Sequence, residues 1–175
     1  MKVYGAALAA AMTFAMNADA FAQSAKTIPT DLAAIMVQEA VAKCRAEGSK
    51  ITAKVVDASN VEKAFLRDEG AGAVTVEFAQ AKINTVLLLG RMSGANPDAM
   101  PNVIKGANPK TSIFGGMSAI DASGRLMHAI DAGGAVPIMI GAELAGVIGV
   151  SGATSPLADR ACAAAGIAKV ADRLK

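Results

Sequence analysis

The chain has almost no aromatic side chains and little net charge. Its 175 residues include no Trp and one Tyr, and the formal net charge is +2 at pH 7. Nucleic-acid binding relies on basic surfaces and stacking aromatics, so the composition argues against a nucleic-acid partner. The apolar residues are mostly small and aliphatic, and a core built from them buries little area per residue. Such domains often gain stability by association, so we expect a homo-oligomer.

Histidine and cysteine are also scarce, which limits the available metal chemistry. His128 is the only histidine, so a site built from several histidines is excluded. Cys44 and Cys162 are the only cysteines, and each falls on a predicted helix. An isolated pair in an oxidising compartment is typical of a disulfide. The alternative is two small buried thiols in helix interfaces.

Long hydrophobic runs are absent beyond the N-terminal segment. Lys2 precedes an almost wholly apolar stretch, and Ala20, Phe21 and Ala22 fit the small-x-small cleavage rule. The apolar stretch is shorter than the ~20 residues needed to cross a bilayer, which favours a signal peptide over an uncleaved anchor. We expect a signal peptide over residues 1–22 and one domain over 23–175, periplasmic or secreted, with no membrane span after cleavage.

Residues 133–153, GGAVPIMIGAELAGVIGVSGA, predict the central hairpin of the fold. Two apolar runs are joined by Gly141 and Ala142, and a two-residue step that begins with Gly favours a type II′ turn. Ser155 and Pro156 then supply an N-cap hydroxyl and a proline at the first helical position. The final helix is therefore predicted from Pro156 to about residue 174.

The preceding residues show alternating helical and strand patterns. Helix, strand, strand and helix are predicted over residues 31–47, 51–56, 61–66 and 75–89, with Thr30 and Thr75 as N-caps. Residues 91–111 hold three prolines and predict a loop with at most a short helix near Pro97. A second turn is expected at 121–124, between short strands. Hairpins placed between helices favour an α+β domain with a mostly antiparallel sheet.

Two residues invite a chemical interpretation on their own. Ser151 lies where a nucleophile elbow would place its serine, but Ala153 stands where the second glycine belongs, so a strand-ending turn is preferred. His128 is a candidate axial haem ligand, because one imidazole suffices when a macrocycle supplies four other donors. A loop methionine is the other candidate axial donor. The plain alternative for His128 is a surface or hydrogen-bonded histidine.

Four charged residues fall near the ends of predicted elements: Asp57, Arg67, Asp68 and Lys82. They are consistent with ion pairs that fix the first hairpin against the second helix. The alternative is a polar rim for a ligand that carries carboxylates, with Arg67 and Lys82 as donors.

These residues resemble the GlcG/HbpS-like family. The resemblance rests on Pro137, on residues 146–153 (GVIGVSGA) and on Asp159, and it extends to residues 55–58, Arg67, Ala79, Lys82 and Thr85. The chain departs from the family pattern at Gly141 and Ala142, at Asn60, and in the run 82–86. The resemblance implies a profilin-like antiparallel sheet with helices packed on its faces, multimeric assembly and haem binding.

The leading hypothesis is an exported, non-enzymatic protein that binds haem or another tetrapyrrole. It would sequester this small-molecule ligand or present it to a sensor or uptake partner. Asp57, Arg67, Lys82 and His128 are the predicted ligand-binding residues, with His128 as the metal ligand. One alternative is a periplasmic accessory protein or enzyme acting on a small hydroxy acid, in which Asp57, Arg67 and Lys82 bind and transfer protons. A third hypothesis is an interaction module whose only role is assembly.

Overall fold

The computed structural model describes residues 26–89, 117–120, 126–130 and 132–175. The predicted signal peptide, the predicted loop 91–111 and the predicted turn 121–124 lie outside the described residues. In chain order the elements are α1 (Thr30–Ala46), β1 (Thr52–Asp57), β2 (Glu62–Arg67), α2 (Val74–Leu89), β3 (Met117–Ile120), β4 (Leu126–Ala129), β5 (Ala135–Ile140), β6 (Glu143–Ser151), α4 (Pro156–Ala168) and a 3-10 helix, Ala171–Arg173.

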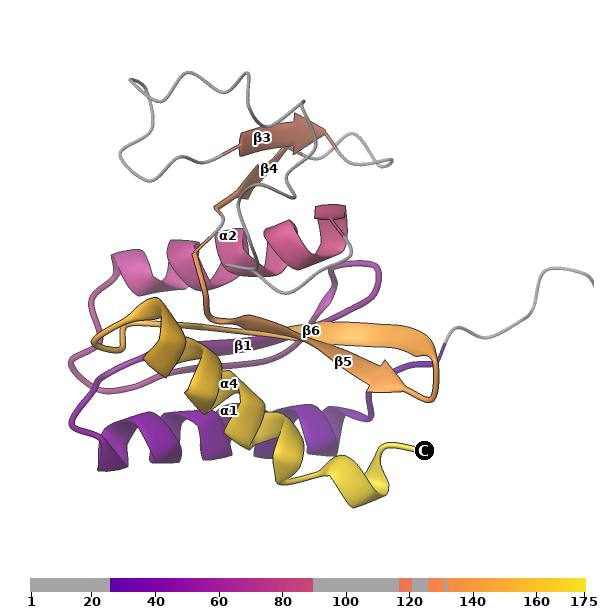
Figure 1. The fold of residues 1–175 in the computed structure, drawn as a ribbon, viewed down its shortest axis with the longest axis horizontal. Helices are drawn as coiled ribbons and strands as arrows, with labels where there is room; N and C mark the ends of the chain where they lie inside the picture. The colour runs from indigo at the N-terminus through magenta and orange to yellow at the C-terminus, as the bar shows by residue number, and fades with distance from the viewer. Residues whose placement is uncertain (1–25, 90–116, 121–125, 131) are drawn as a thin grey trace, which may run out of the picture.

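A four-stranded antiparallel sheet forms the middle of the domain, in the order β2-β1-β6-β5. Helices α1 and α4 cover one face, and α2 covers the other (Figure 1). Strands β3 and β4 form a separate antiparallel pair, and β4 contacts α2. This arrangement confirms the predicted α+β fold with helices on both faces of an antiparallel sheet. No helix among the described residues is long and apolar enough to cross a membrane.

The central hairpin forms as predicted. Ile140 pairs with Glu143, which leaves Gly141 and Ala142 as a two-residue turn between β5 and β6. Gly141 has φ 63°, while Ala142 does not have a positive φ, and this combination is that of a type II′ turn.

The first hairpin closes through side-chain hydrogen bonds at its turn. Asp57 Oδ1 accepts from the backbone N–H groups of Ser59 and Val61, each at 2.9 Å. Asn60 has φ 62°, a conformation that asparagine tolerates better than most residues. Asn60 therefore replaces a turn glycine without disrupting the hairpin.

The helix ends partly differ from the prediction. Pro29, not Thr30, occupies the N-cap of α1, and α2 begins one residue before Thr75, whose hydroxyl donates to Gly72 O at 2.6 Å. Ser155 does cap α4, accepting from Ala158 N at 3.1 Å. Helix α4 ends at Ala168 instead of continuing to about 174, because Val170 leaves the helical path and is buried in the core.

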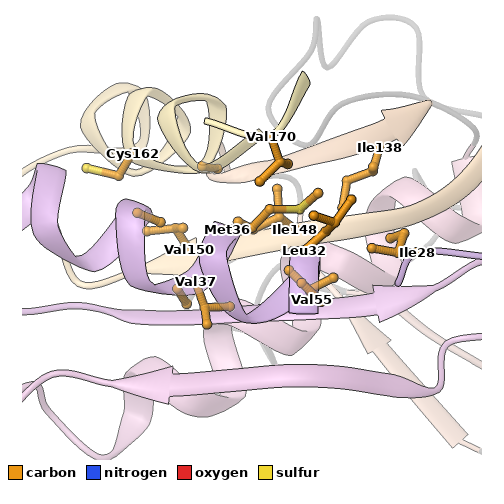
Figure 2. Packing of buried hydrophobic residues seen from close by; sticks show 14 of the residues in the cluster. Ile28, Leu32, Met36, Val37, Val55, Ile138, Ile148, Val150, Cys162 and Val170 are labelled. Atoms are coloured by element: carbon orange, nitrogen blue, oxygen red, sulfur yellow. The ribbon is translucent and has the colours of Figure 1, made fainter. Parts of the chain in front are cut away.

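The larger core fills the space between the sheet and the helices α1 and α4. Figure 2 shows Met36 of α1 among Ile138, Ile148 and Val150 of the sheet. Cys44 and Cys162 form the predicted disulfide, which joins α1 to α4 across 118 residues of sequence. These contacts tie the N-terminal and C-terminal helices into one layer.

A smaller core lies between the sheet and α2. Val56, Ile83, Val86, Ala135 and Val147 form its buried cluster. Gly149 makes the close packing possible, because a Cβ there would lie 2.6 Å from Ala79 O and 2.6 Å from Ile83 Cγ1. The close approach brings the middle of α2 beside the C-terminal end of β6, where the candidate site lies.

Candidate functional site

A buried ion pair joins α2 to the first turn of α4. Lys82 Nζ lies 2.7 Å from Asp159 Oδ2 and donates a second hydrogen bond to Val150 O at 3.1 Å. Asp159 Oδ1 accepts from Ala153 N at 2.9 Å. Both charged residues are 4% exposed. The pair therefore links α2 to the loop after β6 and to α4, two neighbouring segments that are both distant from α2 in sequence.

Two local features hold the pair in place. Asp159 lies in the first turn of α4, where the helix dipole favours an anion. Gly134 has φ 131°, and a Cβ there would lie 2.9 Å from Lys82 Nζ and 2.9 Å from Asp159 Cβ, so glycine leaves the necessary space. Burial raises the pKa of the Asp159 carboxyl above its ordinary value, and the Lys82 ammonium opposes that rise.

A cavity of about 420 Å³, which we call the Lys82 pocket, opens beside this pair. Its volume lies within the range of roughly 300 to 1,000 Å³ that is common for small-molecule sites. Most of the wall surface is apolar, and Lys82 and Asp159 are its charged members. The described lining residues are Val74, Thr75, Phe78, Lys82, Ile130, Ala132, Ser151, Gly152, Ala153, Thr154, Ser155, Pro156 and Asp159.

A second cavity of about 450 Å³, the Gln80 pocket, is lined by Gln80 and Asn84 of α2, by residues of the first hairpin and by Met127 of β4. Its polar groups largely satisfy one another: Gln80 Nε2 donates to Asn84 Oδ1 at 2.8 Å and to Asn60 Oδ1 at 3.0 Å. Lys54 Nζ is paired with Glu62 Oε2 at 2.8 Å. Met127 contributes a thioether, which lies 3.4 Å from Asn60 Nδ2. This amide network is more typical of a structural contact than of a ligand-binding site.

The structure separates Asp57 from Arg67. Arg67 pairs with Thr52 at the start of β1, whereas Asp57 lies at its other end. The Arg67 guanidinium donates from Nε to Ala71 O at 3.0 Å and from Nη2 to the same oxygen. Neither residue is part of the described wall of either cavity, so their predicted ligand contacts remain predictions.

Asp68 pairs with cations at and just after the end of α1, whereas the sequence suggested ion pairs between the first hairpin and the second helix. Arg45 Nη2 lies 2.6 Å from Asp68 Oδ1, and Lys50 Nζ lies 3.7 Å from Asp68 Oδ2. These contacts connect the end of α1 to the loop before α2. The four charged residues therefore do not form one cluster, and of them only Lys82 lines a described cavity.

His128 lies on β4 between residues that line the two pockets. Met127 lines the Gln80 pocket and Ile130 lines the Lys82 pocket, while His128 itself is exposed. Its backbone oxygen accepts from Asn84 Nδ2 at 2.7 Å. Its role as an axial ligand stays a prediction. Within the described ranges, no group of three or more His, Cys, Asp and Glu side chains is placed to hold a metal ion.

The pairing of Lys82 with Asp159 is the feature that sequence reasoning missed. Both residues stand out in the sequence, one on a helix face and the other in a helix first turn, but 77 residues separate them. Asp159 comes shortly after β6 along the chain, whereas Lys82 comes close to β6 only because α2 packs on Gly149. The sequence therefore holds no signal that joins the two residues.

A family model described as "Haem degrading protein HbpS-like" matches residues 28–168. No curated protein is significantly similar to the chain in sequence. Among solved structures, a double mutant of HbpS from Streptomyces reticuli is 21% identical with a TM-score of 0.63, and the match covers 95% of this chain and 99% of that one. Protein ORFY from Klebsiella pneumoniae is 19% identical with a TM-score of 0.63, covering 85% and 93% of the two chains. PduOC in complex with haem is 19% identical with a TM-score of 0.59, covering 81% and 94%.

Proposed function

Because the chain belongs to the HbpS-like family, we propose that it binds haem or a related tetrapyrrole in the Lys82 pocket. The observation that carries the proposal is a largely apolar cavity whose wall contains a buried lysine. The solved haem complex of PduOC, which shares the fold, supports this choice of ligand. The protein holds or presents its ligand without turnover, outside the cytoplasm.

The described residues of the Lys82 pocket suit both the apolar ring of a tetrapyrrole and its carboxylate groups. Val74, Phe78 and Ile130 offer apolar contacts for a flat ring. Lys82 offers the cation that a propionate carboxylate needs. Bound haem would supply an iron centre with a strong absorption band, which is the convenient readout of binding.

The iron ligand in this proposal is His128. Histidine is among the residues that commonly hold haem iron, and His128 lies two residues before Ile130 of the pocket wall. Met127 is the second candidate, although its thioether lines the Gln80 pocket. Asp57 and Arg67 lie outside the described wall of this pocket, so a ligand contact at either residue stays a prediction.

Titration of the purified domain, residues 23–175, with haemin tests the proposal. We expect saturable binding with a shifted Soret band, and a changed spectrum for His128→Ala. Lys169→Ala, a substitution of an exposed cation at the end of α4, is the matched control and should bind as the wild type does. A titration with no saturable Soret change would refute tetrapyrrole binding, and an unchanged spectrum for His128→Ala would remove that ligand.

The same samples distinguish holding from degradation. After addition of ascorbate or hydrogen peroxide, a holding protein keeps its Soret absorbance over the time that free haemin bleaches. Catalysed loss of the band, together with an open-chain tetrapyrrole product detected by mass spectrometry, would show that the protein is an enzyme and would overturn the non-enzymatic part of the proposal.

Export and assembly belong to the same proposal. The Cys44–Cys162 disulfide is compatible with an oxidising compartment, and N-terminal sequencing of secreted material should begin at Gln23. Exposed apolar side chains at Val61 and Phe65, beside and on the edge strand β2, support a homo-oligomer. Light scattering that gave a monomer at micromolar concentration would contradict this. A sensor or uptake protein that receives the ligand is the proposed partner.

A further inference from the structure

The hydroxyl of Ser151 makes no hydrogen bond to the residues that the structure describes, and protein does not fully enclose it. Ser151 is the last residue of β6 and is 4% exposed. Side chains alternate along a strand, and Val147 and Gly149 of β6 face α2, so Ser151 faces the same side. There it lines the Lys82 pocket. An accessible hydroxyl in a pocket wall can donate to or accept from a ligand atom that replaces water.

The Lys82 ammonium has spare donor capacity in the same pocket. An ammonium carries three N–H groups. Val150 O and Asp159 Oδ2 accept two of them, and the structure gives the third no acceptor within its described residues. Because Lys82 donates to the carbonyl of the residue just before Ser151, the two unpaired donors belong to one corner of the pocket.

We propose that Ser151 and Lys82 together bind a carboxylate group of the ligand. The two donors suit the two oxygens of a carboxylate, and the ammonium supplies the charge that a neutral acceptor would not need. The apolar residues opposite them, Phe78 and Ile130, then contact the carbon part of the ligand. Ser151 thus becomes the residue that distinguishes a free acid from its ester.

Asp159 decides how strongly this corner attracts an anion. With Asp159 ionised, the buried pair is neutral overall, and binding depends on hydrogen bonds more than on net charge. The Ser151 hydroxyl therefore carries a larger share of recognition than it would beside an unpaired lysine.

A carboxylate can come from either of two sources. One is the propionate of a tetrapyrrole, in which case the inference rests on the proposed function. The other is a small free carboxylic acid, such as a hydroxy acid, which the cavity of about 420 Å³ also accommodates. Both sources present the same group to Ser151 and Lys82, so one set of variants tests them.

The experiment compares haemin with haemin dimethyl ester in the same detergent, for the wild type and for Ser151→Ala. Ser49→Ala is the matched control, because Ser49 is also a buried serine but lies in the segment between α1 and β1, outside the pocket. Ser151→Ala removes only a hydroxyl and is expected to fold. Glycolate and lactate are titrated separately, with binding followed by thermal shift and by proton–nitrogen NMR spectra.

We expect Ser151→Ala to weaken haemin binding about tenfold, the usual cost of one hydrogen bond to a charged group. The same substitution should leave the binding of the ester unchanged. If haemin does not bind but glycolate or lactate does, and Ser151→Ala weakens that binding, the carboxylate site stands and the tetrapyrrole function falls. A different result would overturn the carboxylate site and leave the tetrapyrrole function intact. In that result the wild type and Ser151→Ala bind haemin and its ester equally well, and neither small acid binds.

Discussion

The Lys82–Asp159 pair should make a large contribution to folding that depends on both partners. Its atoms are 2.7 Å apart and its side chains are 5% and 6% exposed. Exposed ion pairs contribute about 0 to 1 kcal/mol, whereas removal of one partner of a buried pair costs about 3 to 5 kcal/mol. The second range applies here because almost no water reaches either charge.

The perturbation is Asp159→Asn, which keeps the shape of the side chain and removes its charge. The Lys82 ammonium is then left in the protein interior with Val150 O as its remaining strong acceptor. We expect the free energy of unfolding to fall by about 3 to 5 kcal/mol. For a domain of this size, 1 kcal/mol lowers the melting temperature by roughly 2 to 4 °C, so a decrease of about 10 °C is expected.

Lys82→Met removes the other partner of the ion pair, and the stability of this variant should depend on pH. It leaves the Asp159 carboxyl buried without its cation, and burial already raises the pKa of that group. A folded-state pKa above the unfolded value means that the folded protein binds the proton more tightly. The stability of Lys82→Met should therefore increase as the pH is lowered through the raised pKa toward about 4, the ordinary aspartate value.

The assay is urea unfolding of the oxidised protein followed by far-ultraviolet circular dichroism, because the chain has no tryptophan for fluorescence. The double variant Lys82→Met/Asp159→Asn completes the cycle and should cost less than the sum of the two single variants. Strictly additive single effects, or an Asp159→Asn variant within about 1 kcal/mol of the wild type, would refute the reasoning.

Three further outcomes are expected. Replacing Cys44 and Cys162 by alanine should lower the free energy of unfolding by about 4 to 5 kcal/mol, and a reductant should then destabilise the wild type but not the variant. Gly149→Ala should cost about 1 to 3 kcal/mol through overpacking against α2, measured beside Gly72→Ala, whose added methyl meets no atom closer than 4.0 Å. The hydrogen bond from Arg45 lowers the pKa of Asp68. The stability advantage of the wild type over Asp68→Asn should therefore be full above about pH 4 and disappear as the pH falls through the lowered pKa. An advantage that grows in acid would contradict this prediction.

Local chemistry was sufficient to predict much of the fold. Gly141 at a two-residue step predicted the central hairpin, and Ser155 followed by Pro156 predicted the start of α4. These signals involve neighbours along the chain, so they do not depend on the rest of the molecule. Where neighbours in space compete, the prediction was wrong: burial of Val170 ends α4 early.

The candidate site shows the same division. The sequence by itself determined which residues are unusual: a lysine on an apolar helix face, an aspartate in a helix first turn, and a serine at the end of a strand. Only the tertiary structure decided that Lys82, Asp159 and Ser151 meet in one pocket, while Asp57 and Arg67 lie at opposite ends of β1. The reason is physical: the pocket forms because α2 packs on the bare backbone of Gly149, and periodicity along one chain carries no information about such a contact.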